Sequence, residues 1–255
     1  MLSFMFNRKV NAHQASVTSL ACSAFRLIIR IAISSGIFLC ASVSAQSLGV
    51  SPVYVSLSED NRIASITVTN SSNKPRTIQI RLYEWTHEGI KTELIDTKDI
   101  IPSPPIAVIP AKKTQIVRVG MRMSAEKHYE KSYRLILDEI PQLDSAGVIM
   151  ALKISLPIFV KPSETQVNHN LDWHIEKRNG EHFLVAKNIG NGHVKINDIA
   201  VSPTMLTHAE AQSNIYVLPK SYYEWKLPSE VMNHRNIQVK ANVHGQAVSI
   251  SVPVL

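Results

Sequence analysis

The segment 148–160 constrains the fold of this chain more than any other part of the sequence. It reads VIMALKISLPIFV, and Lys153 is its only charged residue. The segment is too short to cross a bilayer as a helix, and Pro157 interrupts any regular helix within it. An apolar run between turn-forming residues is typical of a strand covered on both faces. If the fold covers only one face, another molecule must cover the other.

The sequence before this segment predicts many short strands rather than helices. Apolar residues alternate with polar ones over runs of four to seven residues, and clusters such as Asn70-Ser71-Ser72-Asn73-Lys74-Pro75 separate the runs. Short strands at regular spacing are typical of an immunoglobulin-like sandwich. The runs are 63–69, 77–83, 106–109, 114–119 and 133–137.

A second all-β unit follows the apolar segment. The polar stretch 161–165 contains Pro162, which disfavours further strand pairing. Beyond it, Asn179-Gly180 separates two strand-like runs, 172–177 and 182–187, and predicts a hairpin with a type I′ turn. Further runs cover 194–201, 214–218, 223–227, 237–243 and 248–254. We expect an all-β fold with a first domain over 46–161, a linker over 162–168 and a second domain over 169–255.

The first 45 residues have the pattern of a secretory signal peptide. Arg26 and Arg30 precede the short apolar stretch 31–40, and small residues then end in Val43-Ser44-Ala45. We expect cleavage between Ala45 and Gln46 and export of the remaining chain. A lipoprotein reading through Cys40 is weaker because Leu39 is bulky. A permanent membrane anchor is also weaker, because the apolar stretch is short.

Removal of this leader changes what the composition implies. The whole chain has 27 Lys and Arg against 20 acids, and four of the basic residues lie in the leader, so the net charge falls from +7 to +3. A basic surface for nucleic acid is therefore not indicated. Both cysteines, Cys22 and Cys40, also lie in the leader. The exported chain must be stabilised by apolar cores rather than by disulfides.

The sequence contains no pattern that predicts an enzyme, a metal site or a bound cofactor. Asp138 and Glu139 are adjacent on a predicted strand, so their carboxylates should point to opposite faces. There is no nucleophile elbow and no glycine-rich phosphate loop. Seven of the ten histidines follow the linker without the spacing of a zinc motif, and we expect them to be scattered. They are His169, His174, His182, His193, His208, His234 and His244.

The apolar segment has two readings that its residues alone leave open. It could be a central strand of the first sandwich. It could instead be an edge strand that displays one apolar row, namely Val148, Met150, Leu152 and Ile154. Natural proteins avoid such edges because they pair with other chains, so an exposed one suggests that pairing is its task.

Three cations near this segment are candidates for binding an anion. Arg118 and Arg134 are each flanked by apolar strand residues, and Lys153 interrupts the apolar run. Such residues can simply lie on a solvated face. They can also line a cleft and hold a carboxylate through charge-assisted hydrogen bonds.

The sequence resembles the periplasmic pilus-assembly chaperones of the chaperone–usher pathway. It is more similar to the archaic branch than to the P pilus or type 1 pilus chaperones. The similarity covers about residues 49–255. It depends on SYRLILDEIP at 132–141, PIFVKP at 157–162, SITVTN at 65–70 and PAKKTQIVRV at 110–119. In the second domain, NIGNGHV at 188–194 and VLPKS at 217–221 are also similar to the family.

The resemblance implies two immunoglobulin-like domains set at an angle and a function in strand donation. Family members lend a strand to a pilus subunit whose own sandwich is incomplete, and they deliver the subunit to an outer-membrane usher. On this pattern Val148, Met150 and Leu152 form the donor row, with Ile154 as a candidate fourth member. The partners would be pilin subunits and the usher, without nucleotide. The same edge could also pair two copies of the free chaperone.

One family feature is missing from this sequence. The best-known chaperones hold the carboxyl terminus of the subunit with two cations, and Tyr54 and Pro157 stand at those positions here. We hypothesise that Arg134 or Arg118 replaces them, with Lys153 as a further candidate.

Two other classes of protein fit the predicted fold. A secreted pilin or adhesin should carry an alternating N-terminal extension, but residues 46–53 are short and contain Pro52. A carbohydrate-binding module should expose clustered aromatics. Trp85, Trp173 and Trp225 are spread over both domains, and we expect them to pack in cores.

Overall fold

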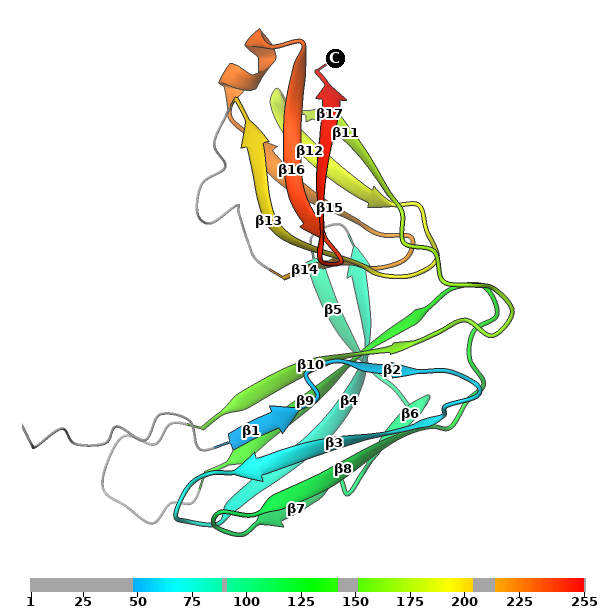
Figure 1. The fold of residues 1–255 in the computed structure, drawn as a ribbon, viewed down its shortest axis with the longest axis vertical. Coiled ribbons are helices and arrows are strands. Elements are labelled where there is room, and N and C mark those ends of the chain that lie inside the picture. The colour runs from blue at the N-terminus through cyan, green and yellow to red at the C-terminus, as the bar shows by residue number, and fades with distance from the viewer. Residues whose placement is uncertain (1–47, 89–90, 142–150, 204–213, 255) are drawn as a thin grey trace, which may run out of the picture. The chain divides into compact units, whose positions relative to one another are not determined.

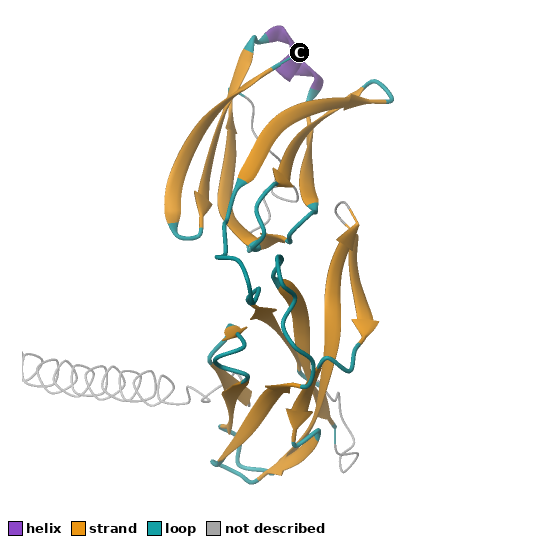
Figure 2. Ribbon diagram, turned by 90° about the vertical axis from the view of Figure 1, so that its right-hand side faces the viewer, coloured by secondary structure: helices purple, strands orange, loops and turns teal. Residues whose placement is uncertain are grey.

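The computed structural model describes residues 48–88, 91–141, 151–203 and 214–254. Within these ranges the chain is built of strands, with one 3-10 turn, η1, at Ser229–Asn233 (Figure 2). The predicted all-β fold is therefore confirmed. The predicted signal peptide, and the candidate donor residues Val148 and Met150, lie outside the described residues.

The first ten strands form one β-sandwich of two sheets (Figure 1). One sheet has the order β1-β3-β8-β6, and the other has the order β2-β10-β9-β4-β5, with β7 also paired to β4. The strands are β1 (Leu48–Ser51), β2 (Val55–Leu57), β3 (Ile63–Asn70), β4 (Arg76–Glu88), β5 (Lys91–Asp96), β6 (Ile100–Ser103), β7 (Ile106–Ile109), β8 (Thr114–Met121), β9 (Lys131–Ile140) and β10 (Lys153–Val160).

Alternation along the strands builds the core of this first sandwich. Ile66 and Val68 on β3 are buried, and so are Val117 and Val119 on β8, while the residues between them are more exposed. From the opposing sheet, Leu135 on β9 packs into the same cluster. A period of two therefore places one apolar face of each sheet inside the sandwich.

The N-terminal strand is divided between the two sheets. β1 pairs antiparallel with β3, whereas β2 pairs parallel with the end of β10, where Val55 lies beside Ile158. The chain crosses from one sheet to the other over Pro52–Tyr54. β2 is only three residues long, so it accompanies β10 only over Ile158–Val160.

The second sandwich contains the remaining strands, in the orders β11-β12-β15 and β14-β13-β16-β17. Asn179 and Gly180 have φ values of 52° and 81°, so the predicted left-handed turn between β11 and β12 is confirmed. The strands are β11 (Leu171–Arg178), β12 (Glu181–Asn188), β13 (Val194–Ser202), β14 (Ile215–Val217), β15 (Tyr222–Leu227), β16 (Asn236–Val243) and β17 (Gln246–Pro253).

All three tryptophans pack in apolar surroundings, as predicted. Trp225 is 2% exposed, and Trp173 stacks on it with ring centroids 5.8 Å apart. Trp85 is 3% exposed and forms a small separate cluster with Phe159 and Leu218. These rings therefore do not form the exposed aromatic platform that a carbohydrate-binding module would need.

Candidate functional site

The first half of β10 lies at an open edge of its sheet. β10 pairs with β9 over its whole length, from Lys153 opposite Asp138 to Val160 opposite Lys131. On its other side, β2 reaches only Ile158–Val160. Within the described part of the chain, residues 153–157 therefore have no strand neighbour on that side. The backbone groups that point outward there are free to pair with an added strand.

Exposure along this stretch follows the predicted alternation. Ala151, Lys153 and Ser155 are exposed, whereas Leu152 and Ile154 are half-buried and pack against the core of the first sandwich. The two candidate donor residues that the structure describes thus share one face. From Leu156 to Val160 every residue is buried.

Arg134 is a half-buried cation without a carboxylate partner among the described residues. It projects from β9 opposite Pro157, and its guanidinium carbon lies 3.6 Å from the centre of the Trp85 ring. The Tyr216 ring of β14 lies 5.6 Å from the same carbon. Burial lowers the pKa of the Arg134 guanidinium below its ordinary value. The aromatic faces partly compensate its charge, but they leave its hydrogen-bond donors available to an anion.

The other two candidate cations lie elsewhere. Arg118 is exposed on β8, in the opposite sheet, beside Ser65 and Ser103. Lys153 is exposed on the same face of the β9–β10 pair as Arg134 but four residues along β10 from Pro157, a separation of about 13 Å. The structure therefore does not bring the three cations together.

Two neighbouring carboxylates point to opposite faces of β9, as predicted. Asp138 forms an ion pair with Arg81 on the outer face. The Glu139 side chain is only 3% exposed and pairs with Arg76, with 2.5 Å between Oε1 and Nη1. They do not form a paired acid–base site.

Three histidines gather in the second sandwich, contrary to the expectation that they are scattered. His169 Nδ1 and His244 Nε2 both donate to the carbonyl oxygen of His193, at 2.6 and 3.0 Å. The His193 ring donates from Nδ1 to Oε1 of Glu130 at 2.7 Å, and both of these side chains are buried. Burial, followed by the charges of the other two histidines, lowers the pKa of His244. No group suited to a metal ion occurs in the described ranges.

The histidine cluster borders a pocket of about 650 Å³. Its lining includes Tyr54, Lys161, Lys195 and Tyr216 as well as the three histidines. The signal that the sequence reading missed is topological. His193 precedes β13 and His244 follows β16, and antiparallel pairing of β13 with β16 brings these two residues together. His169 precedes β11, and the Gly192 amide, which donates to the Asn168 carbonyl, holds that segment beside His193.

No helix in the described ranges is long and apolar enough to cross a membrane. Comparison with known proteins finds a family model that is similar to the first sandwich. Residues 47–166 match the family model described as "Pili and flagellar-assembly chaperone, PapD N-terminal domain". No curated protein matches the chain.

Several solved structures share the fold over most of their length. One belongs to the CsuC–CsuE chaperone–tip adhesion subunit pre-assembly complex from archaic chaperone–usher Csu pili of Acinetobacter baumannii, with a TM-score of 0.66, 21% identity, and 81% of this chain and 98% of that chain covered. The Salmonella enterica SafA pilin in complex with the SafB chaperone gives 0.61, 14%, 84% and 99%. The E. coli chaperone DraB gives 0.58, 16%, 82% and 97%. These likenesses show the two-sandwich fold.

Proposed function

We propose that this chain is a member of the pili and flagellar-assembly chaperone family, whose N-terminal domain model matches residues 47–166, and that it folds, caps and delivers pilus subunits by donating a β-strand. The observation that carries the proposal is the open edge of β10, where residues 153–157 have one strand neighbour among the described residues and Leu152 and Ile154 form a half-buried apolar row. The client would be a subunit whose own sandwich lacks a strand.

Strand donation uses both the backbone and the side chains of this edge. The N–H and C=O groups of Lys153 and Ser155 point away from β9 and can extend a ladder into the client, whereas Pro157 has no N–H and marks the end of that ladder. The apolar row of Val148, Met150, Leu152 and Ile154 would fill the client's groove. Each apolar side chain that becomes fully buried contributes about 1.5–3 kcal/mol. The donation therefore requires no nucleotide.

For the client's terminal carboxylate we propose Arg134 as the anchor. It lies directly opposite Pro157, the position at which better-known chaperones are expected to carry a cation, and it has no carboxylate partner in the described part of the chain. Arg118 lies on the other sheet, and Lys153 is four residues away along β10. The geometry thus favours Arg134 over both.

The proposed location is the periplasm, where members of this family act. The leader would direct export and would be removed by cleavage between Ala45 and Gln46. The proposed destination of each subunit is an outer-membrane usher, to which the chaperone carries a subunit whose groove is still filled by the donor strand.

Co-purification from periplasm tests the proposed function. The tagged chain should retain a pilus subunit, identified by mass spectrometry, and Met150→Asp should reduce the retained amount at least 100-fold, because a carboxylate in an apolar groove is strongly unfavourable. Ile116→Asp is a matched control, because Ile116 is an exposed apolar residue on β8 of the opposite sheet. A Met150→Asp protein that is folded and still retains the subunit would refute strand donation.

The anchor is tested in the same assay. Arg134→Ala should weaken subunit retention about 10-fold or more, whereas Arg118→Ala should retain it as the wild type does. Wild-type retention by both variants would refute Arg134 and Arg118 as the carboxylate anchor while leaving strand donation intact.

A further inference from the structure

A buried carboxylate accepts a backbone hydrogen bond directly before the ladder between β9 and β10 begins. Glu139 belongs to the face of β9 that carries Tyr133, Leu135 and Leu137 into the core, and its side chain is 3% exposed. A carboxylate in such an environment must be paired and hydrogen-bonded. Its partners therefore show what it holds in place.

One of those partners is the backbone of the candidate donor segment. The Leu152 amide donates to Oε2 of Glu139 at 3.2 Å, and the Glu139 amide donates to the Leu152 carbonyl oxygen at 2.9 Å. In a regular antiparallel pair the first bond would end on the backbone carbonyl of Glu139. Here the side chain takes its place, directly before the first ladder pair, Lys153 with Asp138.

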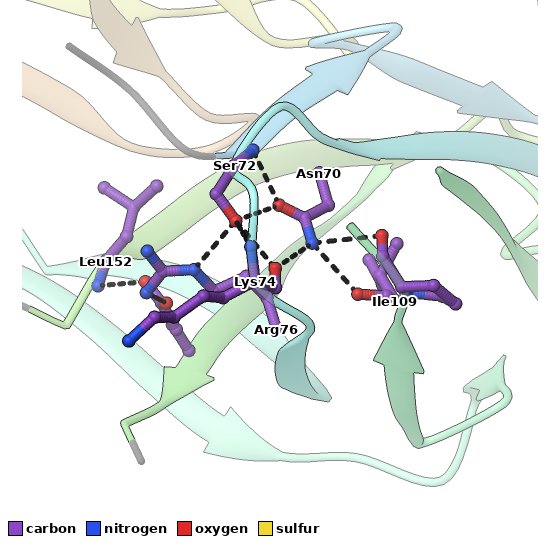
Figure 3. A network of polar contacts seen from close by, with 8 residues as sticks. Asn70, Ser72, Lys74, Arg76, Ile109 and Leu152 are labelled. Carbon is purple, nitrogen blue, oxygen red and sulfur yellow. Dashed lines mark hydrogen bonds and ion pairs between the residues drawn. The ribbon is translucent and has the colours of Figure 1, made fainter. Parts of the chain in front are cut away.

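The carboxylate is itself held by a rigid support. Arg76 contacts Oε1 of Glu139 at 2.5 Å and donates from Nε to the Ser72 hydroxyl at 3.3 Å. That hydroxyl lies 2.7 Å from Oδ1 of Asn70, a fully buried residue. The Asn70 amide in turn donates to the carbonyl oxygens of Lys74 and Ile109, at 2.8 and 3.0 Å (Figure 3). The turn between β3 and β4 thus fixes the position of Glu139.

The apolar run needs such a fixed point because its own pattern specifies the register poorly. Register is normally set by which residues fit the buried face. If residues 150–153 moved into the positions of residues 152–155, Met150 and Leu152 would replace Leu152 and Ile154, and the core would still receive only apolar side chains. The closed half is held by the buried Phe159, so hydrophobicity opposes displacement of residues 158–160 but hardly opposes a local displacement of the open half by two residues.

We propose that Glu139, held by Arg76, is a positioning residue that holds Leu152 directly before β10 and so sets which side chains form the donor row. The consequence for clients rests on the proposed function. The selection of register is a property of the free chain and can be measured without a client.

Disulfide trapping measures the register. Cys22→Ser and Cys40→Ser remove the only cysteines, and Asp138→Cys is then combined with either Lys153→Cys, for the observed register, or Ala151→Cys, for the register displaced by two. Lys153 and Asp138 are directly opposite each other and form a non-hydrogen-bonded pair. The Cα atoms of such a pair lie about 4.5 Å apart, which is within the range of a disulfide. With Glu139 present, we expect the 153–138 pair to form in at least tenfold excess under thiol exchange.

Substitutions of Glu139 then separate its acceptor from its bulk. Glu139→Gln keeps an oxygen for the Leu152 amide and should keep the tenfold preference. Glu139→Leu has a similar size without an acceptor, and the two cross-links should then form within about threefold of each other. Arg76→Met with Glu139→Leu removes the whole pair, which often preserves folding, and should give the same result. A tenfold preference that persists in either folded leucine variant overturns the proposal.

The two proposals fail in different experiments. If the cross-links shift as expected while no pilus subunit is retained by the wild type, the proposed function is wrong and the positioning role stands. If subunits are retained while the leucine variants keep the observed register, the reverse holds.

Discussion

The two halves of β10 differ although their sequence is one apolar run. Ile158–Val160 lie between β2 and β9 and are buried on both faces, because Phe159 is covered by Trp85, Leu218 and the His193 ring. Residues 153–155 have only β9 beside them among the described residues and alternate between exposed and half-buried. Similar hydrophobicity thus serves a closed core in one half and an open edge in the other.

This difference shows that apolar content alone does not distinguish core from donor. In the closed half, the outer face is covered by residues that are distant in sequence, such as Leu218. In the open half, the described residues provide no second strand, and the surplus apolar surface is available to the proposed client. The following predictions test whether the two halves differ in energy as they do in geometry.

The largest effect should come from Phe159→Ala in the closed half. Phe159 is 0% exposed, and its ring stacks on that of His193 with centroids 3.6 Å apart. We expect a loss of about 3–5 kcal/mol in the free energy of unfolding, measured by urea denaturation. Ser155→Ala, on the same strand but exposed, is the control and should change it by less than about 0.5 kcal/mol. Equal losses of unfolding free energy in Phe159→Ala and Ser155→Ala would mean that the closed half contributes no more to stability than the open half.

A smaller loss should follow Ile154→Ala in the open half. The side chain is already half accessible in the free chain, so we expect only about 1–2 kcal/mol by the same measurement. Retention of a pilus subunit should fall more than stability does, because the lost contacts are completed only in the complex. A destabilisation as large as that of Phe159→Ala would identify residue 154 as ordinary core.

The cover of the closed half should respond to pH through His87, whose ring lies edge-on to Trp85. Burial, followed by the charge of Arg134, lowers the pKa of His87 to about 4 from 6.5. The unfolded chain therefore binds more protons between these values, so stability is complete above about pH 6.5 and falls as the pH drops toward 4. Since water reaches part of the ring, we expect a loss of about 1–2 kcal/mol.

Urea denaturation at pH 7 and pH 4 measures this contribution of His87. His87→Gln should show a smaller loss than the wild type by that amount, which separates the histidine from carboxylates that titrate in the same range. Identical losses in both proteins would exclude His87 as the source.

The smallest effect should come from Lys153→Ala. Lys153 is exposed and forms no ion pair among the described residues, since its opposite residue Asp138 is paired with Arg81. We expect a change within about 0.5 kcal/mol in the free energy of unfolding. A larger change would show that the start of β10 depends on this charge rather than on Glu139.

The local pattern of the sequence predicted much of the fold. Asn179-Gly180 specified a hairpin because both residues tolerate positive φ, and alternation over residues 63–69 specified a strand because one face of it is buried. The pattern could not predict where a neighbouring strand in the sheet ends. The division of the segment 148–160 into open and closed halves depends on the length of β2, which has only three residues. β2 lies near the start of the first sandwich and is distant from this segment in the sequence.

The candidate site was predictable only where one strand determines it. The shared face of Leu152 and Ile154 follows from the period of two. The surroundings of Arg134 do not, because Trp85 and Tyr216 come from β4 and β14. The meeting of His169, His193 and His244 likewise depends on contacts between segments that are distant in sequence, so no spacing in the sequence announces it.

The crossing of the N-terminal strand at Pro52–Tyr54 determines how long the vacancy beside β10 is. Val55 lies beside Ile158, and the same offset continued backwards would set residues 48–54 beside residues 151–157. Those residues instead cross over and join β3. The chain thus possesses a strand of the right length to occupy its own edge and uses it in the other sheet. Moving the crossing point toward the N-terminus would shorten the vacancy residue by residue, so the place of this crossing sets the length of β10 that is open to an added strand.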